Sequence, residues 1–262
     1  MDLLYDVFII KPVAKYYYMD TKFKIAICGD SWAMGEFTKA DKYFVKCSYG
    51  LPTMLEQAGF TVLDRTNTGQ SPQQCLDLLL RGTPELSPDL IIWFDTDPLR
   101  ELRGNDSVAL KVLANQNIFE SWWRFYLRKV YQDLNKLNIP VWIIGASVDH
   151  APAISKGLDN LKPVIPSLKT WLDESYSHEV NYGYSLLTVR KLADLKIGLR
   201  VKDSILTNCL AMANYMESSD LYPDGMHPNK QCHQRLSDYL VGLINEQFFA
   251  QGTVEVSMSP AS

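Results

Sequence analysis

Short apolar segments of strand length alternate with helical segments in this chain, and this alternation constrains its fold most. Residues 23–28 and 89–94 are apolar and rich in β-branched side chains, as strands buried on both faces of a parallel sheet are. Residues 60–63 and 140–144 have the same character in shorter form. Strands that alternate with helices predict a parallel sheet covered by helices on both faces, so we expect an α/β fold.

Helical periodicity fills the intervals between these strands. Residues 51–58 and 72–80 are helical in pattern, apolar residues recur at three- and four-residue steps over 119–137, and a last helix follows Pro228. Residues 147–210 carry scattered prolines and tyrosines, which favour long loops and short helices. We therefore expect one domain with an extension and a tail, divided as follows: 1–22 extension, 23–249 domain with an irregular insertion around 148–210, 250–262 loose tail.

Composition narrows the partners and the location. Among 262 residues 47% are hydrophobic and 21% charged, values typical of globular domains, and the net charge is −4. An acidic chain has no positive field for phosphates or anionic lipid, so we expect neither nucleic acid nor a membrane as partner. The apolar run Val7 to Ile10 is too short for a signal peptide or a membrane span. Five cysteines without a CxxC pair favour a reducing, cytoplasmic location.

Polar clusters directly follow three of the predicted strands. Residues 29–31 read Gly-Asp-Ser, 67–69 read Asn-Thr-Gly and 95–97 read Asp-Thr-Asp. A fourth cluster, Tyr-Pro-Asp-Gly-Met-His-Pro at 222–228, precedes the last helix. Parallel sheets bind ligands beyond the carboxyl ends of their strands, so we expect these clusters to meet in one site.

Three residues of these clusters have the chemistry of a serine hydrolase. A serine hydroxyl becomes nucleophilic when an imidazole takes its proton, and the imidazole needs a carboxylate to fix its tautomer and orientation. Ser31, His227 and Asp224 could fill these roles. The three-residue spacing between Asp224 and His227, in a loop containing Pro and Gly, lets the carboxylate reach the ring nitrogen that faces away from Ser31.

The order of the clusters resembles the SGNH hydrolases, also called GDSL esterases. Their blocks match GDS near the N-terminus, NxG after the second strand and DxxH before the last helix, over roughly residues 23–249. The resemblance implies a flavodoxin-like three-layer α/β/α sandwich with a parallel sheet of about five strands. It also implies Ser31 as nucleophile, His227 as base, Asp224 as its orienting carboxylate, backbone N–H donors at Ser31 and Gly69 for the oxyanion, and no cofactor.

One position departs from the family pattern. Asp97 stands where the family has an asparagine that donates to the oxyanion, and an ionised carboxylate can only accept hydrogen bonds. Either Asp97 is protonated, or Thr96 or Arg100 donates instead, or the hole has two donors. We expect Trp32, Thr96 and Arg100 to contact the substrate, an ester of a small acyl group such as acetyl with a carbohydrate or other polar alcohol.

Two other functions compete with this one. The apolar strand followed by Asp95-Thr96-Asp97 resembles the first motif of haloacid-dehalogenase-type phosphatases, in which Asp95 would be the nucleophile and Mg²⁺ essential. Asp97 also keeps open a catalytically degenerate binding module on the same fold. Ser71, in a near match to GxSxG, is interpreted as a helix N-cap, and the isolated histidines 150, 178 and 233 as packing or surface residues. No metal-ligand spacing such as HExxH is present.

Overall fold

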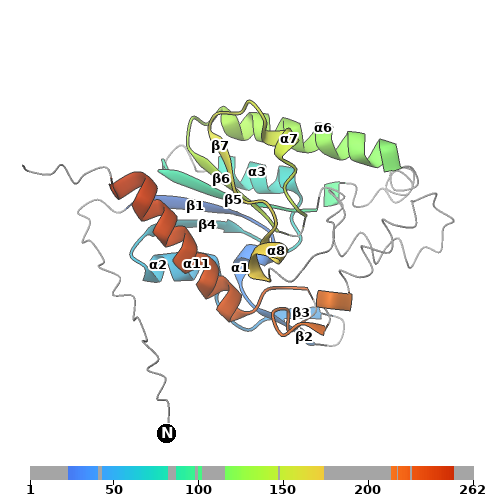
Figure 1. Cartoon of the computed structure of the whole chain (residues 1–262), viewed down its shortest axis with the longest axis vertical. Helices are drawn as coiled ribbons and strands as arrows, with labels where there is room; N and C mark the ends of the chain where they lie inside the picture. The colour runs from blue at the N-terminus through green and yellow to red at the C-terminus, as the bar shows by residue number, and fades with distance from the viewer. Residues whose placement is uncertain are drawn as a thin grey trace, which may run out of the picture.

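A five-stranded parallel sheet forms the centre of the molecule (Figure 1). The computed structural model describes residues 23–40, 43–81, 87–97, 100–101, 116–146, 148–173, 214–216, 218–224 and 226–250. The sheet order is β4-β1-β5-β6-β7, in which the second strand of the sheet lies outside the first, as in flavodoxin-like folds. The strands are β1 (Lys24–Gly29), β4 (Thr61–Thr66), β5 (Leu90–Asp95), β6 (Val141–Gly145) and β7 (Leu161–Ile165).

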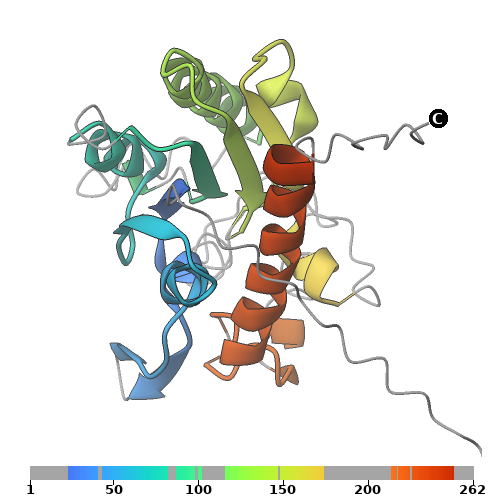
Figure 2. The ribbon, with the colours of Figure 1, turned by 90° about the vertical axis from the view of Figure 1, so that its left-hand side faces the viewer.

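Helices cover both faces of this sheet, which confirms the predicted three-layer sandwich (Figure 2). On one face lie α3 (Pro72–Leu80), α6 (Gln116–Asn135) and α7 (Pro152–Ser155). On the other lie α1 (Ser31–Met34), α2 (Leu51–Gln57), α8 (Leu168–Leu172) and α11 (Lys230–Ile244). The predicted strands and helices therefore occur close to their expected positions. The spacing of apolar residues in a strongly periodic segment indicates both its secondary structure and its buried face.

Two features of the sheet region were not located by sequence. Strand β7 contains Pro163 and has only Leu161 and Ile165 fully buried, and a proline is tolerated there because β7 is an edge strand. A separate antiparallel hairpin joins β2 (Phe37–Ala40) to β3 (Tyr43–Lys46). Neither segment contains an apolar run as long as those of β1 and β5, which is why the pattern of alternating strands and helices does not reveal them.

The last helix fixes the loop that precedes it. Its buried stripe includes Leu236, Leu240 and Ile244, and the helix continues as a π-helical turn, η2 (Asn245–Phe249). The carboxylate of Glu36, in the connection before β2, accepts the backbone N–H of Lys230 at 2.6 Å. This bond attaches the start of α11 to the segment that follows α1.

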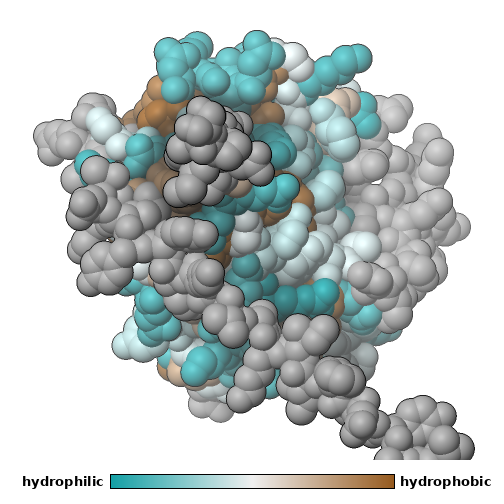
Figure 3. Space-filling view, turned by 60° about the vertical axis from the view of Figure 1, so that its left-hand side comes forward, coloured by the Kyte–Doolittle hydropathy of each residue, from teal (hydrophilic) through white to brown (hydrophobic). Residues whose placement is uncertain are grey.

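The outer surface of the described residues is mainly hydrophilic on the face drawn in Figure 3, with apolar residues in patches between polar ones. Within the described ranges, no helix is long and apolar enough to cross a bilayer.

Candidate active site

The polar clusters that follow β1, β4 and β5 lie at one edge of the sheet, as predicted. Gly29 and Thr66 are register partners at the ends of β1 and β4, and the N–H of Asn67 donates to the carbonyl of Gly29 at 3.1 Å. On the other side of β1, Cys28 pairs with Trp93 of β5. The sheet register therefore brings the loops after three strands beside one another.

Ser31 stands at the start of α1, directly after β1. Asp30 is the N-cap of this short helix, and its side chain accepts the N–H of Trp32 at 3.0 Å. The cap ends the strand and turns the chain so that Ser31 leaves the sheet edge on the first residue of the helix. Asp30 is fully buried and Ser31 is 6% exposed.

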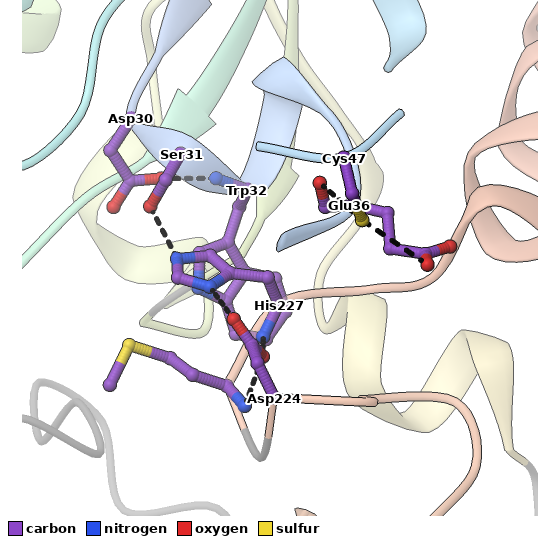
Figure 4. A network of polar contacts seen from close by, with 8 residues as sticks. Asp30, Ser31, Trp32, Glu36, Cys47, Asp224 and His227 are labelled. Atoms are coloured by element: carbon purple, nitrogen blue, oxygen red, sulfur yellow. Dashed lines mark hydrogen bonds and ion pairs between the residues drawn. The ribbon is translucent and has the colours of Figure 1, made fainter. Parts of the chain in front are cut away.

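Ser31, His227 and Asp224 form a continuous chain of hydrogen-bonding contacts, drawn in Figure 4. Ser31 Oγ lies 2.7 Å from His227 Nε2, and His227 Nδ1 lies 2.6 Å from Asp224 Oδ2. Residues 196 positions apart in the sequence thus meet within hydrogen-bond distance. The geometry is that of a nucleophile, a base and the carboxylate that orients the base.

Asp224 is held in place by its own loop. Its Oδ1 accepts the backbone N–H groups of Met226 and His227 at 2.8 and 2.7 Å, which leaves Oδ2 for the imidazole. Burial raises the pKa of Asp224, but the bonds and charge of His227, together with the backbone N–H groups, outweigh burial and lower it below its ordinary value. Asp224 is therefore ionised at neutral pH, as an orienting carboxylate must be.

The hairpin contributes a contact that sequence reasoning missed. The ring of Phe37, on β2, lies with its centroid 4.5 Å from that of His227, at an interplanar angle of 37°. Phe37 is buried, so the imidazole is covered on that side by an apolar surface. The signal was absent from the sequence because a single phenylalanine in a short strand does not show which loop it will cover.

The turn after β4 contains the predicted oxyanion donor Gly69. Its φ is 68°, a left-handed conformation that favours glycine. Ser71 then begins α3 as its N-cap, with a capping box to Gln74, which confirms the N-cap interpretation. Ser71 also bonds to the carboxylate of Glu101.

Asp97 and two of the three predicted substrate contacts are buried, and the third, Arg100, is partly buried. Trp32, Thr96 and Asp97 are each 3% exposed or less, with Trp32 inside the apolar layer between the sheet and α11. Arg100 pairs with Asp30 at 2.6 Å. Burial lowers the pKa of Arg100, but the carboxylates of Asp30 and Asp97 raise it above its ordinary value, so the guanidinium stays charged.

A second serine, histidine and aspartate arrangement lies inside the core. His150 Nε2 is 3.0 Å from Ser155 Oγ, and His150 Nδ1 is 3.2 Å from Asp95 Oδ2. The hydroxyl of Ser155 also donates to the carbonyl of Pro152 in its own helix. Oδ1 of Asp95 accepts from Tyr131 and Trp93, at 2.5 and 3.1 Å. The side chains of His150 and Asp95 are at most 1% exposed, and we interpret the group as a structural network.

This network bears on the phosphatase alternative. A nucleophilic carboxylate with a Mg²⁺ ligand role needs oxygens open to substrate and metal. Both oxygens of Asp95 are instead occupied by buried neighbours. Across the described ranges, no group of three or more His, Cys, Asp or Glu side chains is arranged to hold a metal ion.

Comparisons with known proteins give distant structural likenesses. No family model matches the chain, and no curated protein does. A psychrotrophic esterase, EstA from Pseudoalteromonas sp., is 13% identical with a TM-score of 0.37, over 86% of this chain and 98% of that one. The acetyl xylan esterase AlAXEase is 18% identical with a TM-score of 0.39, over 84% and 99%. Both of those proteins are named as esterases.

Proposed function

We propose that the protein is a serine-dependent carboxyl-ester hydrolase. The observation that carries this proposal is the unbroken path from Ser31 Oγ through the imidazole of His227 to the ionised carboxylate of Asp224. Each contact is 2.7 Å or shorter and each residue is positioned by a different local device, namely a helix start, a ring contact and an Asp-centred loop.

The proposed reaction proceeds through an acyl-enzyme. Nε2 of His227 takes the proton of Ser31 as Oγ attacks the ester carbonyl carbon, and Asp224 stabilises the resulting imidazolium. The tetrahedral intermediate collapses, the imidazolium gives its proton to the leaving alcohol, and the acyl group remains on Oγ. Water then attacks this ester with His227 again as base, which releases the acid and restores Ser31.

The negative charge on the carbonyl oxygen requires hydrogen-bond donors in place before the reaction. We assign these to the backbone N–H groups of Ser31 and Gly69. Ser31 belongs to α1 and Gly69 to the turn after β4, which the register places beside β1. Asp97, buried near the charged Arg100, shapes the loop after β5 in this proposal rather than donating to the oxyanion.

The substrate in this proposal is an ester of a small acyl group, such as acetyl, with a carbohydrate or another polar alcohol. Ser31 is 6% exposed, and the imidazole that it contacts is covered by Phe37, which favours small groups at the reacting carbon in this proposal. A substrate panel that varies acyl length and the leaving alcohol separately would identify the preferred alcohol.

Covalent labelling tests the proposal directly. A fluorophosphonate should modify Ser31 in the full chain, located by peptide mass, and Ser31→Ala should abolish labelling. Ser155→Ala is a matched control, because Ser155 also contacts a histidine that contacts an aspartate. It should leave both labelling and ester hydrolysis unchanged. An adduct on Ser155, or none on Ser31, would contradict the proposal, and the absence of any hydrolysis would favour the non-catalytic module.

A further inference from the structure

Arg100 contacts the loops that follow three different strands. Its Nη1 donates to Asp30 Oδ2 at 2.6 Å, beyond β1, and to the carbonyl of Gln70 at 2.9 Å, beyond β4. Its own backbone N–H donates to the carbonyl of Asp97 at 3.1 Å, beyond β5. One residue therefore ties together the segments that contain most of the candidate site.

The contacts of Arg100 lie next to both proposed oxyanion donors. Asp30 immediately precedes Ser31, and its other oxygen caps α1 through the N–H of Trp32. Gln70 immediately follows Gly69, which has a positive φ, and the carbonyl of Gln70 accepts from Arg100. Ser31 follows β1 and Gly69 follows β4. The distance between the two donors therefore depends on the contacts that hold these two segments together.

The ion pair between Arg100 and Asp30 is buried, so its formation carries a desolvation cost that an exposed ion pair does not have. The side chains are 9% and 0% exposed, and removing two charges from water costs several kcal/mol per ion before their attraction repays it. A guanidinium offers donors in a planar, rigid arrangement, so it fixes the directions of its partners better than a flexible ammonium does. Such a pair is suited to holding geometry.

We propose that Arg100 is a positioning residue of the oxyanion site, and this inference rests on the proposed esterase function. Arg100 sets the distance between the N–H groups of Ser31 and Gly69 through the carboxylate of Asp30 and the carbonyl of Gln70. In this role Nη1 is engaged with two groups of the protein, and the direct substrate contact expected from the sequence stays a separate prediction.

Kinetics of Arg100 variants on p-nitrophenyl acetate test this role. Arg100→Met should lower kcat by about 10²-fold, the effect of losing one oxyanion donor, with KM within about threefold of the wild type. Arg100→Lys keeps the charge opposite Asp30 and should recover part of kcat. In a cycle with Asp30→Asn, the double variant should lose little more than the worse single variant, because both act through one contact.

Arg128→Met is the matched control. Nη1 of Arg128, on α6, donates to the carbonyls of Ile154 and Lys156, both at 2.7 Å. The Arg128→Met variant therefore loses a similar pair of hydrogen bonds in a region outside the candidate site. It should lower the melting temperature while kcat stays within about threefold. If Arg100→Met does not fold, Arg100→Lys decides, and a kcat equal to that of the wild type overturns the proposal.

Two outcomes separate this inference from the function it rests on. If Arg100→Met keeps a wild-type kcat while Ser31→Ala is inactive, the positioning role is wrong and the esterase stands. If Ser31→Ala remains active, the proposed function is wrong and the inference falls with it. Recovery of kcat in Arg100→Ala by millimolar guanidinium, with no recovery in Ser31→Ala, would support positioning, since a merely destabilised fold would not respond in this way.

Discussion

His227 is restrained on three sides, and its role depends on all of them. Asp224 holds Nδ1, Ser31 lies at Nε2, and Phe37 covers the ring. The carboxylate selects the tautomer with its proton on Nδ1, which leaves the Nε2 lone pair for the serine proton. In the proposed mechanism, Asp224, whose pKa is already below its ordinary value, stabilises the protonated imidazole.

At the residue scale, the first prediction is that Ser31 and His227 act as a unit. Ser31→Ala or His227→Ala should each lower kcat/KM for a p-nitrophenyl ester by about 10⁴-fold or more, because either change stops acyl-enzyme formation. The double variant should lose little beyond either single one. Hydrolysis assays at matched protein concentration measure kcat/KM for the wild type and the three variants. Substantial activity in both single variants would contradict the prediction.

A second prediction concerns Asp97, the departure from the family pattern. Asp97→Asn removes one of the two carboxylates that raise the pKa of Arg100, so we expect kcat to fall or to stay within a few-fold of the wild type. If Asp97 were only a defective oxyanion donor, the asparagine would restore a bond worth about 10²- to 10³-fold. Asp133→Asn, in a surface pair with Lys136, is the control. A tenfold rise in kcat would show the shaping role to be wrong.

The candidate site was predictable to the extent that its chemistry lies in short motifs. Ser31, Asp224 and His227 stand out because their residue types and spacing have few structural uses together. Phe37 and Asp30 did not, since one acts through a ring contact and the other through a buried pair with a residue 70 positions away. The first contact depends on where the β2-β3 hairpin packs and the second on the register of β1 and β5, and neither can be predicted from the sequence.

At the scale of elements, the junction of β1 and α1 controls the site. β1 is buried between β4 and β5, and Gly29 ends it one residue before the N-cap of α1. A Cβ on Gly29 would lie 2.6 Å from Cβ of Phe94, on the neighbouring strand. The close approach of β1 and β5 at this edge therefore requires a glycine.

The third prediction follows from this approach. Gly29→Ala should push the ends of β1 and β5 apart, lowering both the melting temperature and kcat, because Cβ of Phe94 belongs to a strand and cannot swing aside. Gly242→Ala is a matched control in the last turns of α11, where a Cβ meets nothing within 4 Å. It should raise stability by about 0.5–1 kcal/mol through helix propensity and leave kcat unchanged. Thermal unfolding and kcat for both variants decide it, and equal effects of the two would contradict the steric argument.

Elements differ in how clearly the sequence shows them. β5 and β6 are buried on both faces and read as continuous apolar runs, and α3 was predicted over the residues it occupies, 72–80. β7 was not located because an edge strand has one free side and needs less apolar character. Residues 1–22, residues 251–262 and most of the expected insertion fall outside the described residues, so the domain division stays a prediction.

For the molecule as a whole, acid sensitivity follows from buried groups that stay uncharged or paired in the fold. His233, on α11, is 1% exposed, and burial lowers its pKa from 6.5 to about 4. In the unfolded chain the same imidazole takes up a proton below about pH 6.5. Asp224, whose pKa is lowered, contributes stability that is present above its unfolded pKa of 3.8 and is lost below it.

The two groups therefore act in different pH windows, which makes the contribution of His233 measurable. Between pH 6.5 and about 4 the unfolded state binds more protons than the folded state, so stability falls as pH falls. From pH 7 to pH 5 this group should cost the wild type about 2 kcal/mol, since each pH unit below the unfolded pKa is worth about 1.4 kcal/mol. His233→Met has no proton to gain and should lose correspondingly less stability over that interval, as measured by urea unfolding at the two pH values.

Gln234→Met, on the exposed side of α11, should keep the wild-type pH dependence. An unchanged difference between pH 7 and pH 5 in His233→Met would mean that His233 is protonated in the folded state and that its burial does not limit the stability of the molecule.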